Sequence, residues 1–345
     1  MRDDDRMLDL PQPEFGSGVI GVCDICGERQ AVIVLAKERY QLCVIDFLNK
    51  TWLKTEKKPG APMPLYRSDR VWFETDASTK GRAQAIVLSP TKTVRRPGVL
   101  ITPDVYGLTT TLLDAAIRFA REGFEVVVPD VAKTDGIGAS HHVTLRSGAR
   151  FRGGVDVAAK RVAELVALYT DALAYLRTRE MVDPAKSALF GASYGASLAL
   201  ALAARETKVG AVVLAYPMPV RPADLATLVT APVLYVGGAS DGPATRARAQ
   251  LDAARGASAL RCWFLDLPGA RHDFLSRDLG AYDVGAAERA WTGIVQFLKQ
   301  QLMPPPPKLP QVPPRPAGFP PAPIPPPLQA AAAPAPATRP APGPA

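Results

Sequence analysis

The sequence predicts an α/β fold in which a mostly parallel central sheet is covered by helices on both faces. Short apolar runs such as PGVLITP, FEVVVPD and GAVVLAY have the length of strands that are buried on both sides. Longer segments with helical periodicity separate these runs, and such alternation is typical of parallel strands joined by helices. The chain has 345 residues and is 47% hydrophobic and 21% charged, a globular composition long enough for one large domain with appendages.

The predicted elements follow one another from residue 71 to residue 302. Two alternating segments, 71–76 and 83–90, predict a hairpin that leads into the sheet. Gly123 and the threonines before Leu112 delimit the first helix. The buried strands expected after the hairpin are 97–103, 124–130, 187–191, 210–216, 231–238 and 261–267, and the main helices are 109–123, 155–179, 194–206 and 281–302.

Changes of composition divide the chain into five parts. We expect a flexible N-terminus (1–16), a zinc-ribbon-like module (17–52), a linker rich in charge, Pro and Gly (53–66), the α/β domain (67–302) and a tail (303–345). More than half of the 35 prolines lie in the tail. A segment of Pro and Ala cannot build a core, so the tail is predicted to be disordered.

Charge and hydropathy exclude several classes of function. The formal charge is +8, but Lys308, Arg315 and Arg339 of the tail supply three of these charges. No dense block of Lys and Arg alternates with aromatic residues, so we expect no nucleic-acid partner. No apolar run reaches 18 residues and the N-terminus lacks the pattern of a secretory signal. We therefore expect a cytoplasmic protein that has no membrane partner.

Polar residues follow five of the predicted strands. They are Asp104, Asp130, Ser193, Asp241 and His272. In open parallel sheets the ligand-binding crevice lies outside the carboxyl ends of the strands. These five side chains are therefore the first candidates for an active site.

Three of these residues form a known chemical set. A serine hydroxyl needs an imidazole to take its proton, and the imidazole needs a carboxylate to fix its tautomer. Ser193 lies in GASYG, and the chain order Ser193, Asp241, His272 is that of the α/β-hydrolase fold. We predict that Ser193 is the nucleophile, His272 the base and Asp241 the orienting acid, with Gly191 and Gly195 allowing strand and helix to approach closely.

Each of these three residues, taken alone, also has a purely structural interpretation. Asp241 precedes Gly-Pro and could be a turn residue or a helix N-cap. His272 could be a surface or core histidine, and Ser193 could be a small polar residue in a glycine-rich turn. The combination favours a catalytic triad, because three positions would otherwise have to follow three separate strands in this order by chance. Ser197 fits better as a packing residue inside the helix.

The segment 67–302 resembles the dienelactone hydrolase family, a branch of the α/β-hydrolases. The resemblance rests on five motifs, which are the loop Asp104-Val105-Tyr106-Gly107, the strand from Gly123-Phe124 to Pro129-Asp130, the elbow Gly191–Gly195, the acid motif Gly238-Ala239-Ser240-Asp241, and the loop Pro268-Gly269-Ala270-Arg271-His272-Asp273-Phe274. These motifs together are specific for the family and do not identify a substrate.

The resemblance implies a hydrolase that cleaves a small ester or lactone through an acyl-enzyme and needs no cofactor for catalysis. It also implies an oxyanion hole made by the backbone N–H groups of Val105 and Tyr194. The Tyr194 N–H is expected at a helix N-terminus, where negative charge is favoured. Arg146, Arg150, Arg152 and Arg277 are only candidates for binding a substrate carboxylate, and a solvated charge is the favoured interpretation of each.

Two positions depart from the family pattern. Dienelactone hydrolases proper have a cysteine where this chain has Ser193 and a glutamate where it has Asp104. A serine does not rest as an anion as a low-pKa cysteine does, so the reaction should depend more heavily on His272. Asp104 is either an active-site residue or a loop cap, and its neighbour Tyr106 is a further active-site candidate.

A cysteine cluster lies in the N-terminal module. Cys23 and Cys26 form a Cys-x-x-Cys knuckle, and Cys43 follows after sixteen intervening residues, with Asp46 three positions beyond Cys43. With a hairpin expected over 31–42 between the two knuckles, this spacing predicts a structural Zn²⁺ site. Either the site is Cys3Asp, or it has degenerated and Asp46 caps a helix; a redox role is the weaker alternative. Cys262 lies within an apolar strand and is predicted to be a buried core thiol.

Two other functions compete with an ester or lactone hydrolase. The first is a catalytically idle scaffold that recruits protein partners through the zinc-ribbon-like module and the proline-rich tail. The second is a hydrolase of a different bond, such as a carbon–halogen or peptide bond. A dehalogenase would normally have Asp at the place of Ser193, and a complete triad argues against an idle fold.

Overall fold

The computed structural model describes residues 65–303, except for 79, 104–108, 132–161, 220–222 and 278–279. Before residue 65 it describes short strands only, namely β1 (Glu14–Phe15), β2 (Gly21–Val22), β3 (Gln30–Ala31), β4 (Ile33–Leu35) and β5 (Tyr40–Leu42). β4 and β5 pair antiparallel, as expected for the predicted hairpin. The zinc-ligand candidates Cys23, Cys26, Cys43 and Asp46 lie outside the described residues, as does the tail, so these assignments stay predictions.

The α/β domain is built on one eight-stranded sheet with the order β13-β12-β11-β10-β8-β9-β7-β6. Its strands are β6 (Tyr66–Glu74), β7 (Arg82–Pro90), β8 (Arg96–Thr102), β9 (Glu125–Pro129), β10 (Val182–Ala192), β11 (Ala211–Ala215), β12 (Val233–Gly237) and β13 (Cys262–Asp266). β7 is antiparallel to both neighbours, whereas all other pairs are parallel. The predicted lead-in hairpin and the mostly parallel sheet are thereby confirmed.

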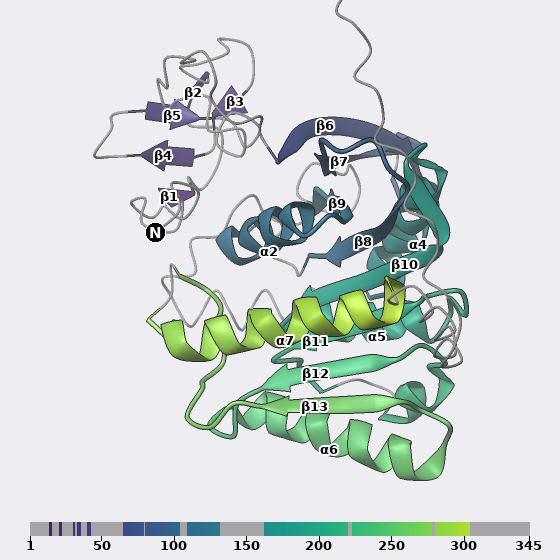
Figure 1. Ribbon diagram of the computed structural model, residues 1–345, viewed down its shortest axis with the longest axis vertical. Helices are drawn as coiled ribbons and strands as arrows, with labels where there is room; N and C mark the ends of the chain where they lie inside the picture. Colours follow the sequence, from purple (N-terminus) through teal and green to yellow (C-terminus); the bar gives the residue numbers. More distant parts are fainter. Residues whose placement is uncertain are drawn as a thin grey trace, which may run out of the picture. The chain divides into compact units, whose positions relative to one another are not determined.

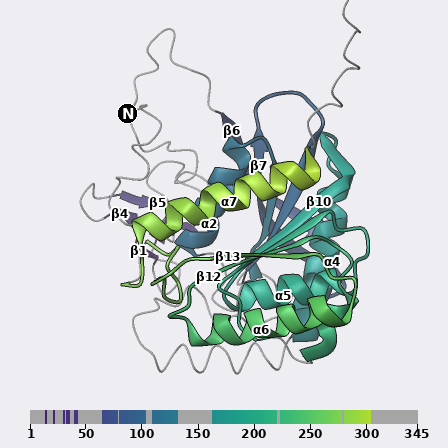
Figure 2. The same ribbon diagram turned by 60° about the horizontal axis from the view of Figure 1, so that its bottom comes forward.

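Five α-helices of the described residues cover both faces of this sheet. They are α2 (Thr110–Arg121), α4 (Val162–Thr178), α5 (Tyr194–Ala203), α6 (Gly242–Ala257) and α7 (Val284–Leu302). Figure 1 shows them along the strands, and in Figure 2 α2 and α7 lie on one side of the sheet while α4, α5 and α6 lie on the other. Among the described residues, every helix is too short or too polar to cross a membrane.

Two strands begin about five residues earlier than the sequence predicted. β6 starts at Tyr66 and β10 at Val182, and the first part of β10 is largely exposed. The pairing of β10 with β8 is irregular between Val182 and Ser187, a stretch that contains Pro184. These polar segments lack the apolar periodicity on which the prediction relied. The connection between β11 and β12 carries a 3-10 helix, Ala223–Leu228.

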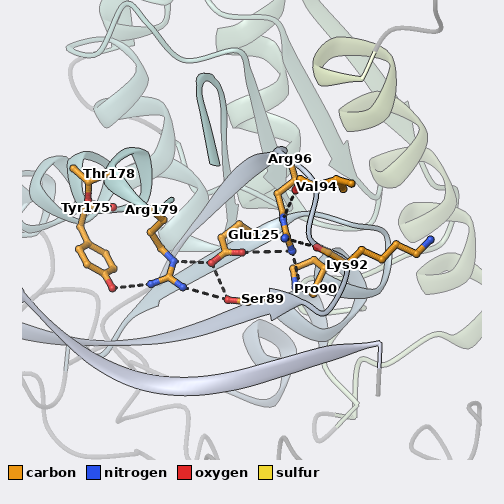
Figure 3. A network of polar contacts seen from close by, with 9 residues as sticks. All are labelled: Ser89, Pro90, Lys92, Val94, Arg96, Glu125, Tyr175, Thr178 and Arg179. Carbon is orange, nitrogen blue, oxygen red and sulfur yellow. Dashed lines mark hydrogen bonds and ion pairs between the residues drawn. The ribbon is translucent and has the colours of Figure 1, made fainter. Parts of the chain in front are cut away.

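A group of buried charges lies where β8 and β9 begin. Glu125, the first residue of β9, accepts hydrogen bonds from Arg179 Nε at 2.6 Å and Ser89 Oγ at 2.8 Å. Arg96, the first residue of β8, is 3.9 Å from the other Glu125 oxygen and donates to three backbone carbonyls. Figure 3 shows these side chains directed toward one another. We call Ser89, Arg96, Glu125 and Arg179 the buried charge network.

Candidate active site

Ser193 occupies a sharp turn between β10 and α5. Its backbone has φ 54° and ψ −123°, a conformation that costs a non-glycine residue about 1–3 kcal/mol. Its N–H donates to the Ala215 carbonyl at 2.9 Å, which ties the turn to the neighbouring strand β11. A Cβ on Gly191 would lie 2.3 Å from the Gly195 carbonyl oxygen, so the turn needs glycine at that position. The close approach expected between strand and helix is therefore present.

The three side chains chosen from the sequence are joined by two hydrogen bonds. Ser193 Oγ lies 2.9 Å from His272 Nε2, and His272 Nδ1 lies 2.6 Å from Asp241 Oδ2. The Asp241 side chain is fully buried, whereas that of His272 is 21% exposed. A buried carboxylate with this contact holds the Nδ1 proton, which leaves Nε2 able to accept a proton from the serine hydroxyl.

Asp241 also caps α6. Its Oδ1 accepts the N–H of Ala244 at 3.1 Å, while its Oδ2 faces the imidazole. The helix cap is present, and it is compatible with the predicted triad role of Asp241, because one carboxylate has acceptor sites on both oxygens. A Cβ on Gly238 would lie 1.9 Å from the Ala270 carbonyl oxygen. Glycine in the acid motif thus allows the two loops that carry Asp241 and His272 to pack together.

The loop that carries His272 is strained and tied to its surroundings. Asp273 has φ 62°, and its Oδ1 lies 3.9 Å from His272 Nε2. The hydroxyls of Ser276 and Thr111 are 2.6 Å apart, which links this loop to the first turn of α2. The loop that carries the imidazole is therefore held by α2 through Ser276 and by the Asp241 loop through the packing of Ala270 on Gly238.

The described residues include one of the two predicted oxyanion donors. Tyr194 is the first residue of α5, where backbone N–H groups have no partner inside the helix and the helix dipole favours negative charge. Burial raises the pKa of its phenol, so this side chain stays neutral. Val105, Asp104 and Tyr106 lie outside the described residues. Immediately before them, the carbonyl of Pro103 accepts a hydrogen bond from the buried hydroxyl of Tyr169 at 2.5 Å.

Other polar candidates have structural partners. Asp130 pairs with Arg70 at 3.1 Å, and Arg70 also donates to Gln84. Arg277, a candidate for binding a substrate carboxylate, pairs with Asp114 at 3.3 Å. The other arginine candidates, Arg146, Arg150 and Arg152, lie outside the described residues.

Cys262 is buried, as the sequence predicted. Burial raises the pKa of its thiol to about 12, and this is the largest influence on the group. The thiol therefore stays protonated and unreactive at neutral pH.

Sequence reasoning missed two residues that support the site, Thr102 and Tyr216, and it missed one contact of Ser197. The Thr102 hydroxyl is within hydrogen-bond distance of the Gly195 carbonyl at 2.8 Å, and so links the end of β8 to α5. Ser197, buried within α5 as expected, also donates to the Met218 carbonyl at 2.7 Å. The Tyr216 ring packs against His272 with centroids 5.2 Å apart. The strand-end rule could have flagged Tyr216, because it directly follows β11.

The sheet order, the strained serine turn and the placement of acid and histidine after later strands define an α/β-hydrolase fold. The chain belongs to the dienelactone hydrolase family, whose sequence model matches residues 83–302. The expected family membership is thus confirmed.

Individual relatives are distant. A probable 2-oxo-3-(5-oxofuran-2-ylidene)propanoate lactonase from Bradyrhizobium sp. is 25% identical over 239 residues, which are 66% of this chain and 93% of that protein. A putative dienelactone hydrolase from Klebsiella pneumoniae is 18% identical, with a TM-score of 0.56 over 67% of this chain and 99% of its own. A dienelactone-hydrolase-like promiscuous phosphotriesterase from metagenomic libraries is 21% identical, with a TM-score of 0.57 over 69% and 99%. These structures share the fold.

Proposed function

We propose that this chain is a serine hydrolase that cleaves a small carboxylic ester or lactone through an acyl-enzyme. The observation that carries the proposal is the hydrogen-bonded series from Ser193 Oγ through His272 to the buried Asp241. Membership of the dienelactone hydrolase family and the likeness to a protein named as a lactonase support the substrate class. The acyl group and the ring size of any lactone are left open by this proposal.

In the first half of the reaction, Ser193 Oγ attacks the carbonyl carbon and its proton moves to His272 Nε2. The carbonyl oxygen becomes an oxyanion, which accepts hydrogen bonds from the Tyr194 N–H and from the Val105 N–H that the family resemblance implies. Asp241 stabilises the imidazolium through Nδ1. The intermediate then collapses, and the alcohol oxygen leaves with the proton from Nε2; in a lactone the alcohol stays attached to the acyl group.

In the second half, a water molecule attacks the acyl-enzyme. His272 Nε2 takes one proton from this water as the oxygen bonds to the acyl carbon. The second tetrahedral intermediate uses the same donors, and its collapse returns the proton to Ser193 Oγ with release of the acid. The hydroxyl of serine carries no charge at rest, so both halves depend on the Nε2 position of His272.

The direct experiment compares Ser193→Ala with the wild type on 4-nitrophenyl acetate and on a small unsaturated lactone. We expect kcat/KM to fall by about 10³-fold or more, because removal of a triad member leaves only binding and oxyanion stabilisation. Ser258→Ala is a matched control, because this serine ends α6 and bonds to the Ala254 carbonyl. Undiminished turnover by Ser193→Ala would contradict the proposal. A wild type inactive on a broad ester and lactone panel would favour the idle scaffold.

A further inference from the structure

The backbone is strained at three neighbouring points of the candidate site. Among the residues that the structure describes, the non-glycine residues with positive φ are Ser193, Tyr216 and Asp273. Ser193 and Asp273 are the proposed nucleophile and the residue next to the proposed base. Tyr216 has no role in the proposed reaction, yet its φ is 36° and its side chain is almost completely buried. A bulky residue in this conformation is an outlier that calls for a reason.

The Tyr216 side chain packs directly against the imidazole. Its ring is 5.2 Å from the His272 ring at an interplanar angle of 67°, and 5.4 Å from the Phe274 ring at 69°. Both are edge-to-face arrangements, which aromatic rings prefer over a face-to-face sandwich. His272 is thereby held at two places, by the Asp241 carboxylate at Nδ1 and by an aromatic ring against its side.

The backbone around Tyr216 is fixed to the strands and to the serine turn. The Tyr216 N–H donates to the Val236 carbonyl at 2.6 Å, and the Met218 N–H donates to the Ser193 carbonyl at 3.3 Å. The Met218 carbonyl in turn accepts the Ser197 hydroxyl at 2.7 Å. The segment from Tyr216 to Met218 therefore contacts both the turn that carries Ser193 and the imidazole ring of His272.

We propose that Tyr216 is a positioning residue that holds the His272 imidazole in line with Ser193 Oγ. This inference rests on the proposed function. The contacts of Nδ1 with Asp241 and of Nε2 with Ser193 are made by ring nitrogens, and the Tyr216 ring, inclined by 67° to the imidazole, adds an aromatic contact that limits rotation of the imidazole. A displacement of about 1 Å at a reacting group can cost about 100-fold in rate. The positive φ at Tyr216 directs the ring to this place from the end of β11.

The test compares Tyr216→Phe with Tyr216→Leu on the ester that the wild type hydrolyses best. Tyr216→Phe keeps the ring, and we expect its kcat to stay within about threefold of the wild type. Tyr216→Leu removes the ring, and we expect kcat to fall by about 10- to 100-fold with KM within about twofold. Phe124→Leu is the matched control: it also removes a buried ring, at the opposite end of the sheet, and should keep its kcat.

Several outcomes overturn the inference. A Tyr216→Leu kcat equal to that of Phe124→Leu leaves Tyr216 no positioning role, and a Tyr216→Phe kcat as low as that of Tyr216→Leu assigns the effect to the hydroxyl. If Tyr216→Leu does not fold, Phe274→Leu removes the ring packed on Tyr216, and an unchanged kcat in that variant overturns the inference. Ser193→Ala distinguishes the two proposals, because full activity in that variant refutes the proposed function itself.

Discussion

Polar side chains are buried both at the carboxyl ends and at the amino ends of the parallel strands, but the two groups differ in what they do. At the carboxyl edge, Ser193, His272 and Asp241 form one hydrogen-bonded series next to strained backbone, and the imidazole is partly exposed. At the opposite end of the sheet, the buried charge network surrounds Glu125 with two arginines and a serine hydroxyl, and Figure 3 shows these side chains turned toward one another. Buried polarity alone therefore does not mark a candidate active site; among the described residues, the strained backbone distinguishes the two groups.

The charges of the network compensate one another. Burial lowers the pKa of Arg96 despite the attraction of Glu125. Burial would also lower the pKa of Arg179, but its hydrogen bond to Glu125 and the charge of that carboxylate raise it. Both guanidinium groups stay charged at any physiological pH. The network should therefore contribute to stability and not to turnover, and the reverse should hold for the triad.

The largest effect is expected for Asp241→Asn, a substitution that separates the helix-capping role of Asp241 from its proposed role in the triad. Asp241→Asn keeps a side chain that can cap α6 but loses the charge that fixes the imidazole, and we expect kcat to fall by about 10³- to 10⁴-fold. Asp283→Asn is the matched control, since Asp283 caps α7 through the Ala286 N–H at 2.9 Å. Steady-state kinetics and urea unfolding of both variants measure this. A small loss of kcat in Asp241→Asn would contradict the triad.

The next effect is on stability and concerns the opposite end of the sheet. Glu125→Gln leaves two arginines without their buried partner, and we expect the free energy of unfolding to fall by about 3–5 kcal/mol. Asp266→Asn, which breaks the exposed pair with Arg248, should cost less than about 1 kcal/mol. Urea unfolding gives both values. The contrast between a stabilising charge network and a catalytic triad would fail if Glu125→Gln unfolded like the wild type. It would also fail if the folded variant lost kcat.

A smaller effect is expected at the serine turn. Gly191→Ala places a methyl group against the Gly195 backbone, and overpacking of this kind costs about 1–3 kcal/mol. The displaced turn should also lower kcat. Gly256→Ala, in α6 with open space around it, should raise stability by up to about 1 kcal/mol. Thermal unfolding of both variants tests this comparison. Equal stability of Gly191→Ala and the wild type would show that β10 and α5 do not approach closely at Gly191.

The last effect, which is absent at neutral pH, is a pH dependence of stability at Cys262. Burial raises the pKa of the folded thiol to about 12, above the ordinary value of the unfolded chain. The folded state therefore holds this proton longer, and stability should decline as the pH rises from about 9 toward 12. Cys262→Ala should show a shallower decline in urea unfolding over this range. Rapid alkylation of Cys262 itself in the native wild type at pH 8, located by mass spectrometry of the peptides, would contradict a buried thiol.

The sequence predicted most of the fold because the central strands are continuous apolar runs and their order follows from helical connections. It also singled out Ser193, Asp241 and His272, because each lies after a strand, either directly or within a short loop, in a chain order specific to one fold. Tyr216 was missed because its role depends on a positive φ and on a ring contact across two strands. Glu125 was missed because a lone carboxylate in an apolar run gives no sign of the arginines that meet it in space.

The central claim is that Ser193 is an activated nucleophile, and a fluorophosphonate probe tests it most directly. The wild type is incubated with the probe and the modified peptide is located by mass spectrometry, with Ser193→Ala and Asp241→Asn treated in parallel. We expect about one label per chain on Ser193, none in Ser193→Ala and slow labelling in Asp241→Asn. An enzyme that hydrolyses esters while Ser193 stays unlabelled, or that is labelled at another residue, would contradict the account.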